Sequence, residues 1–175
     1  WLAIDFDNYL YVYRELYTQK VTADIFARQV LQQEYGEYIK YGVLDSSTWA
    51  KRGDVGPSIA ETMIQEGCQW RPSDRSPRSR INGKLEVHKR LYVDPDIQYP
   101  GMFIFSNCTN LIRTLPLLPT DKNNPEDVDT HAEDHAYDAL RYACMSRPLH
   151  PRSLQTHWNR REENGFSPVD KTFGY

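Results

Sequence analysis

The sequence has few cysteines, no long apolar run and no nucleotide-binding loop, and each absence excludes a class of protein. Its three cysteines, Cys68, Cys108 and Cys144, form no CxxC pair, so neither a disulfide framework nor a thiolate zinc site is expected. A reducing compartment is therefore the default. No stretch approaches the roughly 20 apolar residues of a membrane span, and no signal-peptide pattern occurs, so a membrane is not expected as a partner. Nothing matches GxxxxGK[ST], the phosphate-binding loop of many NTPases.

The composition of the chain indicates one folded domain in which basic and acidic residues are concentrated in different segments. The 175 residues are 39% hydrophobic and 13% aromatic, which favours a real core over disorder. The net charge of −3 says little, but residues 71–90 carry seven Lys or Arg against two acids, and residues 121–138 carry seven acids against one Lys. This polarity is typical of a phosphate-binding face beside a cation site, although a solvated charged helix and loop explain it equally well.

The order of predicted elements indicates an α/β fold. Residues 1–4 and 10–17 read as two strands joined by the turn-prone DFDN at 5–8, which predicts an antiparallel hairpin. Helices and strands then alternate. Helices are expected after Thr22 and after the capping box of Ser58 and Glu61, and then over 81–91, 109–115 and 132–146, with strands at 41–45, 68–71 and 101–105.

The two ends of the chain differ from its middle. The composition shifts at residue 147 to Pro, Arg, Asn, Glu and Gly, so 1–146 is the expected domain and 147–175 a tail or extended arm. The beginning, WLAID, lies inside a strand-like run and has no initiating Met, as in a piece of a longer protein.

The stretch HAEDHAYDALRYA, residues 131–143, concentrates carboxylates and imidazoles at the start of a helix. Asp134 lies in the expected first turn, with His131 three residues earlier on the same side and Asp138 one turn later. Helix capping and salt bridges to Arg141 are the plain alternative. Mutual repulsion among the acids of 126–138 favours a positive partner, either a divalent metal or a basic molecule.

A second carboxylate, Asp45, ends the apolar strand YGVLD, where α/β sheets usually place their sites. Its plain alternative is a cap on the following turn. Because a metal site needs carboxylates from separate rigid elements, a strand end facing a helix start is a suitable pair. Hard oxygen ligands with one imidazole favour Mg²⁺ or Mn²⁺ over zinc.

Together, YVYRELY at the end of the hairpin, GVLDSS and EDHAYDALRYA resemble the nuclease domain of the large terminase subunit of tailed bacteriophages, over roughly residues 1–146. The resemblance implies an RNase H-like mixed sheet with flanking helices and a two-metal endonuclease that cuts concatemeric viral DNA in the host cytoplasm. It implies Asp45, Asp134 and His131 as catalytic residues and Asp45, Asp134 and Asp138 as ligands of two Mg²⁺ or Mn²⁺ ions. Double-stranded DNA is the implied substrate, and the portal, the small subunit and an ATPase domain of the same polypeptide are the implied partners.

DNA phosphates are expected to meet basic side chains without sequence choice. The predicted contacts are Lys51, Arg52, Arg71, Arg75, Arg78, Arg80 and Lys84, and Lys89 and Arg90 either join them or solvate a helix face.

The chain departs from the family in its first strand, which in family members carries a catalytic aspartate and which would lie upstream of Trp1. Asp5 and Asp7 sit in the hairpin turn and do not replace it. Two alternatives therefore remain open: a non-catalytic RNase H-like module that docks a packaging motor or binds DNA, and a resolvase-like fragment.

Overall fold

A computed structural model of the chain describes residues 1–51, 53, 56–93, 95 and 98–148. The expectations for Arg52 and for most of the 147–175 tail lie outside these residues. No helix in the described part of the chain has the length and hydrophobicity needed to cross a membrane.

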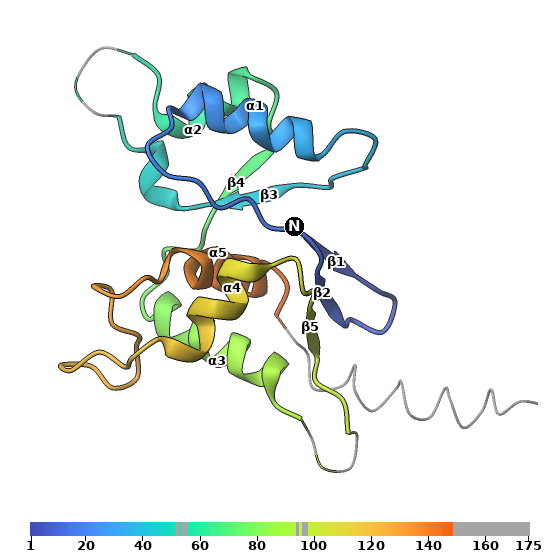
Figure 1. The fold of residues 1–175 in the computed structure, drawn as a ribbon. Helices are drawn as coiled ribbons and strands as arrows, with labels where there is room; N and C mark the ends of the chain where they lie inside the picture. Colours follow the sequence, from blue (N-terminus) through green and yellow to red (C-terminus); the bar gives the residue numbers. More distant parts are fainter. Residues whose placement is uncertain (52, 54–55, 94, 96–97, 149–175) are drawn as a thin grey trace, which may run out of the picture.

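The strands form two small sheets, and the fold is mixed α/β as expected (Figure 1). In the first sheet β1 (Leu2–Ile4) pairs antiparallel with β2 (Leu10–Val12), which confirms the hairpin, and β2 pairs parallel with β5 (Met102–Ile104). In the second sheet β3 (Gly42–Leu44) pairs parallel with β4 (Trp70–Pro72). The resemblance implies one mixed sheet, whereas the described strands form two sheets with no hydrogen-bonded strand between them.

The hairpin turn is set by Asp5, whose Oδ1 accepts hydrogen bonds from the backbone N–H groups of Asp7 (3.0 Å) and Tyr9 (2.9 Å). Asn8 takes the positive φ of 67° that the turn requires, a conformation that Asn tolerates better than most residues. The Asp5 side chain therefore has a local role in the turn.

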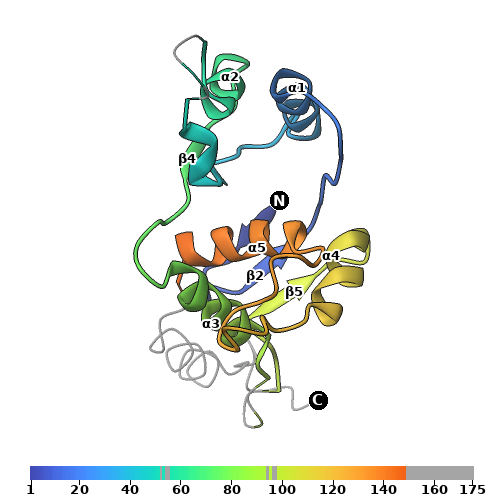
Figure 2. The same cartoon turned by 90° about the vertical axis from the view of Figure 1, so that its left-hand side faces the viewer.

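The first core lies between the three-stranded sheet and helices α3 (Ser79–Leu91), α4 (Thr109–Thr114) and α5 (His135–Ser146) (Figure 2). The short 3₁₀ turn η2 (Leu115–Leu117) continues α4. Burial alternates along β2, which turns Leu10 and Val12 toward the helices. The buried members of this core are Leu10, Val12, Val87, Met102, Cys108, Leu111, Val128, Tyr137, Leu140 and Cys144.

The second core lies between the two-stranded sheet and helices α1 (Ala23–Gln33) and α2 (Ile59–Gln65), and it buries Ala27, Val30, Met63 and Cys68. The expected capping box is present at the start of α2: Ser58 Oγ accepts from Glu61 N (3.1 Å), and Glu61 Oε2 accepts from Ser58 N (2.7 Å).

Helix α3 corrects one expectation. Ile81, Leu85, His88 and Leu91 have helical spacing, yet Leu85 is 52% exposed and Leu91 is 37% exposed. The buried face instead carries Gly83, Glu86, Val87 and Arg90. Arg90 is fully buried and donates to the carbonyl groups of Asn8 and Arg147, so the prediction that it contacts DNA or solvates a helix face is wrong. Carbonyl partners make the burial of this guanidinium possible.

Candidate functional site

Asp45 connects the part of the molecule built on the two-stranded sheet, where it follows β3, with α5 of the part built on the three-stranded sheet. It follows β3 and caps the 3₁₀ turn η1 (Ser46–Trp49), because its Oδ1 accepts a hydrogen bond from Ser47 N at 2.7 Å. Its other oxygen, Oδ2, accepts a hydrogen bond from the hydroxyl of Tyr142 in α5 at 2.9 Å. The capping interpretation is thus correct for one oxygen, while the second is directed at the helix that carries the acidic motif.

The ionisation of Asp45 follows from these contacts. Burial raises the pKa of its carboxyl group, but the hydrogen bonds from Ser47 and Tyr142 outweigh burial and leave the pKa below its ordinary value. The same environment raises the pKa of Tyr142 to about 12, through burial first and then through Asp138 and Asp45. Asp45 is therefore a charged and oriented carboxylate at neutral pH.

Asp134 stands immediately before α5, which begins at His135, three residues later than the sequence pattern predicts. The reason is an intervening turn in which Asp129 Oδ1 accepts from the backbone of His131 at 2.9 Å. The Asp134 side chain makes no capping hydrogen bond, although it is only 8% exposed. Burial and the nearby Asp138 raise the pKa of Asp134. The ring of His135 lies close by, with its Nδ1 3.7 Å from Asp134 Oδ1.

Arginines supply the positive charge among the acids. Arg141 is 3% exposed and bonds Asp138 Oδ1 through Nε (3.0 Å) and Nη2 (2.9 Å). Arg80 on α3 bonds Asp127 at 2.7 Å and reaches Asp138 at 3.8 Å. Because Arg141 pairs with Asp138, the alternative that placed its salt bridge on Asp134 is replaced by a network of Asp127, Arg80, Asp138 and Arg141.

His131 lies at the surface, apart from this network. Its side chain is 91% exposed, and its Nδ1 is 3.1 Å from Asp129 Oδ1. The same-side spacing with Asp134 that suggested a shared site assumes a helix already formed at 131, and the turn at 129–134 removes that register.

The carboxylates near the start of α5 have the chemistry of metal ligands, but too few of them gather in one place to hold a metal ion. Among the residues that the structure describes, Asp134 is buried without a hydrogen bond from a guanidinium, and the buried hydroxyl of Tyr137 has no hydrogen-bond partner, so hard oxygen donors are available. However, in the part of the chain that the structure describes, no three His, Cys, Asp or Glu side chains gather as a metal ion needs. Tyr142, the partner of Asp45, is eight residues beyond Asp134, about 12 Å along a helix.

The predicted DNA contacts fall into two groups. Three have partners in the acidic loop: Arg78 pairs with Glu126 (3.3 Å), Arg80 with Asp127 (2.7 Å), and Lys84 donates to the carbonyl oxygens of Pro125 (3.3 Å) and Asp127 (3.2 Å). The others, Lys51, Arg71 and Arg75, are exposed, and the guanidinium of Arg71 stacks 4.2 Å from the centre of the Tyr41 ring.

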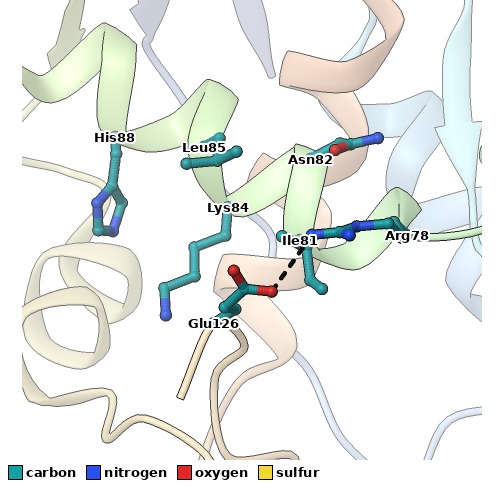
Figure 3. Close-up of a pocket in the computed structure, with 7 residues that line it drawn as sticks. All are labelled: Arg78, Ile81, Asn82, Lys84, Leu85, His88 and Glu126. Carbon is teal, nitrogen blue, oxygen red and sulfur yellow. Dashed lines mark hydrogen bonds and ion pairs between the residues drawn. The ribbon is translucent and has the colours of Figure 1, made fainter. Parts of the chain in front are cut away.

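A cavity of about 350 Å³ lies between α3 and the acidic loop, which comprises residues 121–127 (Figure 3). Helix α3 contributes Ile81, Asn82, Lys84, Leu85 and His88, Arg78 precedes them, and Glu126 comes from the loop opposite.

Sequence reasoning missed Tyr142, Asp127 and the internal role of Arg80. Tyr142 lies at i+4 from Asp138, so its place on the same helix face was readable. Its bond to Asp45 spans 97 residues and leaves no local signal.

Comparisons of the chain with protein-family models, with curated proteins and with solved structures found no match.

Proposed function

We propose that this chain is the endonuclease part of a terminase-like DNA-packaging protein, with Asp45 and Asp134 as catalytic carboxylates and double-stranded DNA as the substrate. In this proposal Asp138 is an outer ligand, His131 an auxiliary group, and Mg²⁺ or Mn²⁺ the cofactor. An ATPase domain of the same polypeptide, the portal and the small subunit are the proposed partners, in the host cytoplasm.

The observation that supports this proposal best is the bond between Asp45 and Tyr142. It holds a strand-end carboxylate against α5, whose first turn carries Asp138 and whose start carries Asp134. Tyr142 fixes the orientation of Asp45, and the hydrogen bonds to Asp45 keep it charged. The stacking of the Arg141 guanidinium 4.5 Å from the centre of the Tyr142 ring stabilises this arrangement.

The described residues bring too few carboxylates together for a complete metal centre. What these residues do by themselves is to present one charged carboxylate, Asp45, and one buried carboxylate, Asp134, from two separate elements.

A second candidate is the non-catalytic docking or DNA-binding module. It is favoured by one observation: Arg80, Arg141 and Arg113 pair with Asp127, Asp138 and Glu133, which leaves much of the acidic motif neutralised within the chain.

The two candidates are separated by nicking of supercoiled plasmid by a polypeptide extended upstream of Trp1, in Mn²⁺ and with EDTA as control. The nuclease proposal expects Mn²⁺-dependent nicking that falls on the order of 100-fold or more in Asp45→Asn and Asp134→Asn. Asp24→Asn is the matched control, because Asp24 is an aspartate on α1 whose ion pair is with Arg28. The present chain alone is expected to nick little in Mg²⁺ and at most weakly in Mn²⁺.

A folded, DNA-binding extended protein that never nicks would refute the nuclease proposal in favour of the docking module. Nicking by Asp134→Asn at the parent rate would remove Asp134 from the catalytic set.

A further inference from the structure

The acidic segment, residues 121–127, lies along the positively charged side of α3. We call the side chains that it meets there, Arg78, Arg80 and Lys84, the basic face. Arg78 Nη2 is 3.3 Å from Glu126 Oε2, and Arg80 Nε is 2.7 Å from Asp127 Oδ2. Lys84 Nζ donates to two backbone carbonyl oxygens of the same segment. Each cation of the basic face therefore meets an oxygen acceptor supplied by the acidic segment.

These oxygen acceptors resemble the phosphate oxygens of a nucleic-acid backbone. DNA phosphates also present closely spaced, negatively charged oxygens, and guanidinium groups bind carboxylate and phosphate with the same planar donor geometry. A side chain that bonds Asp127 or Glu126 cannot use the same N–H group for a phosphate, so the two ligands exclude each other.

The acidic segment is anchored at its base and loosely held at its tip. Val128, 6% exposed, is part of the first core, and Thr120 forms a β-bridge with it. Toward the tip, Glu126 lines the cavity of about 350 Å³ together with Ile81 and Leu85 (Figure 3), and Leu85 is 52% exposed, so little apolar packing holds the tip on α3. The side chains of Arg78 and Glu126 are 67% and 64% exposed, and such exposed pairs are weak and screened by salt.

We propose that the acidic segment is an internal competitor for DNA: it occupies the phosphate-binding basic face of α3, and a duplex must take Arg78 and Arg80 from Glu126 and Asp127 to bind there. This inference rests on the proposed function, since it assumes that DNA is the ligand. It adds a regulatory contact, because DNA binding and closure of the segment become alternative states of the same cations.

Displacement also changes the acidic motif. Arg80 is within 4.0 Å of both Asp127 and Asp138, so a phosphate that takes Arg80 leaves Asp138 with Arg141 as its remaining arginine partner. The bound duplex would thereby increase the negative charge beside Asp134.

The test compares duplex binding by the parent chain and by the double variant Glu126→Gln, Asp127→Asn, using fluorescence anisotropy with a short labelled duplex. Asparagine keeps an oxygen for the bond from Val128 N to Asp127 Oδ1 (2.8 Å), so the loop is expected to stay folded. The matched control is Asp24→Asn, Glu66→Gln. It removes the same charge from two carboxylates that pair with Arg28 on the second core.

The expected result is affinity tighter than the parent by on the order of tenfold at about 50 mM salt, and a smaller gain at about 200 mM, because salt weakens both the internal pairs and the phosphate contacts. The control should gain much less. Addition of duplex should also shift the NMR signal of the Arg80 Nε–H group in the parent.

Equal gains in the variant and the control would mean a general charge effect and would overturn the inference, as would equal affinities of variant and parent. In both cases the DNA-binding function would stand. No duplex binding by any of the three proteins at about 50 mM salt would overturn both the inference and the proposed function.

Discussion

Gly83 of α3 packs against the Arg141 side chain of α5, and replacing it with alanine tests how tightly Arg141 is held. A Cβ atom at position 83 would lie 2.4 Å from Arg141 Cγ, 2.8 Å from Cδ and 3.2 Å from Met145 Cγ. The first two separations are far below a normal carbon contact of about 3.5 Å or more, so the stem of Arg141 would have to move by roughly 1 Å.

Two effects of opposite sign decide the outcome. Alanine in the middle of a helix is better than glycine by about 1 kcal/mol. Overpacking typically costs about 1–3 kcal/mol, and a weakened charged hydrogen bond costs about 1.5–3 kcal/mol. Arg141 is 3% exposed and bonded twice to Asp138, so it has little room to yield. The unfavourable effects should therefore prevail, and we expect Gly83→Ala to lower the free energy of unfolding by about 1.5–5 kcal/mol.

Urea unfolding followed by circular dichroism measures this change. The matched control is Asn82→Ala, at the exposed neighbouring position of the same helix, which should gain about 0.5 kcal/mol from helix propensity alone. For a urea m-value of about 1–3 kcal/mol/M, the midpoint of Gly83→Ala should fall by roughly 1 M or more. A midpoint for Gly83→Ala at or above that of Asn82→Ala would show that Arg141 moves freely, and the reasoning about the α3–α5 contact would be refuted.

Two further predictions concern buried charge. The pKa of Asp134 is raised by burial and by Asp138, so its folded-state pKa exceeds the unfolded value; the stability it allows is fully present below the unfolded pKa and is lost as the pH rises through the folded pKa. Asp134→Asn should therefore raise the melting temperature at pH 7 by roughly 2–4 °C, with the gain vanishing near pH 3, and calorimetry showing a lower melting temperature at pH 7 would contradict this. Arg90→Ala should cost about 3–5 kcal/mol in urea unfolding, because it opens a cavity and strips donors from the carbonyl groups of Asn8 and Arg147. Exposed Arg75→Ala should change stability by less than about 0.5 kcal/mol, and equal losses for the two variants would contradict the burial of Arg90.

Features with a short-range cause were predictable from the sequence. The capping box of Ser58 and Glu61 and the turn at Asp5 need only neighbours within four residues, and the structure has both. The strand at 41–45 was also expected, and β3 occupies Gly42–Leu44.

Long-range partners explain the differences. The pattern of Ile81, Leu85 and Leu91 indicated the wrong face of α3, because Arg90 counts as polar in any hydrophobic pattern although carbonyl groups 82 and 57 residues away make its burial possible. The opposite charges of 71–90 and 121–138 were visible in the sequence, but they were assigned to external partners. The structure pairs part of each segment with the other.

The three cysteines allow local unfolding of each core to be followed by thiol labelling. All are free and buried, Cys68 in the second core and Cys108 and Cys144 in the first. Burial raises the pKa of each thiol, that of Cys144 to about 11, so little thiolate is available for alkylation while the cores stay closed. Labelling of Cys68 ahead of the other two would therefore show that the half built on β3 and β4 opens separately from the half that contains α3 and α5.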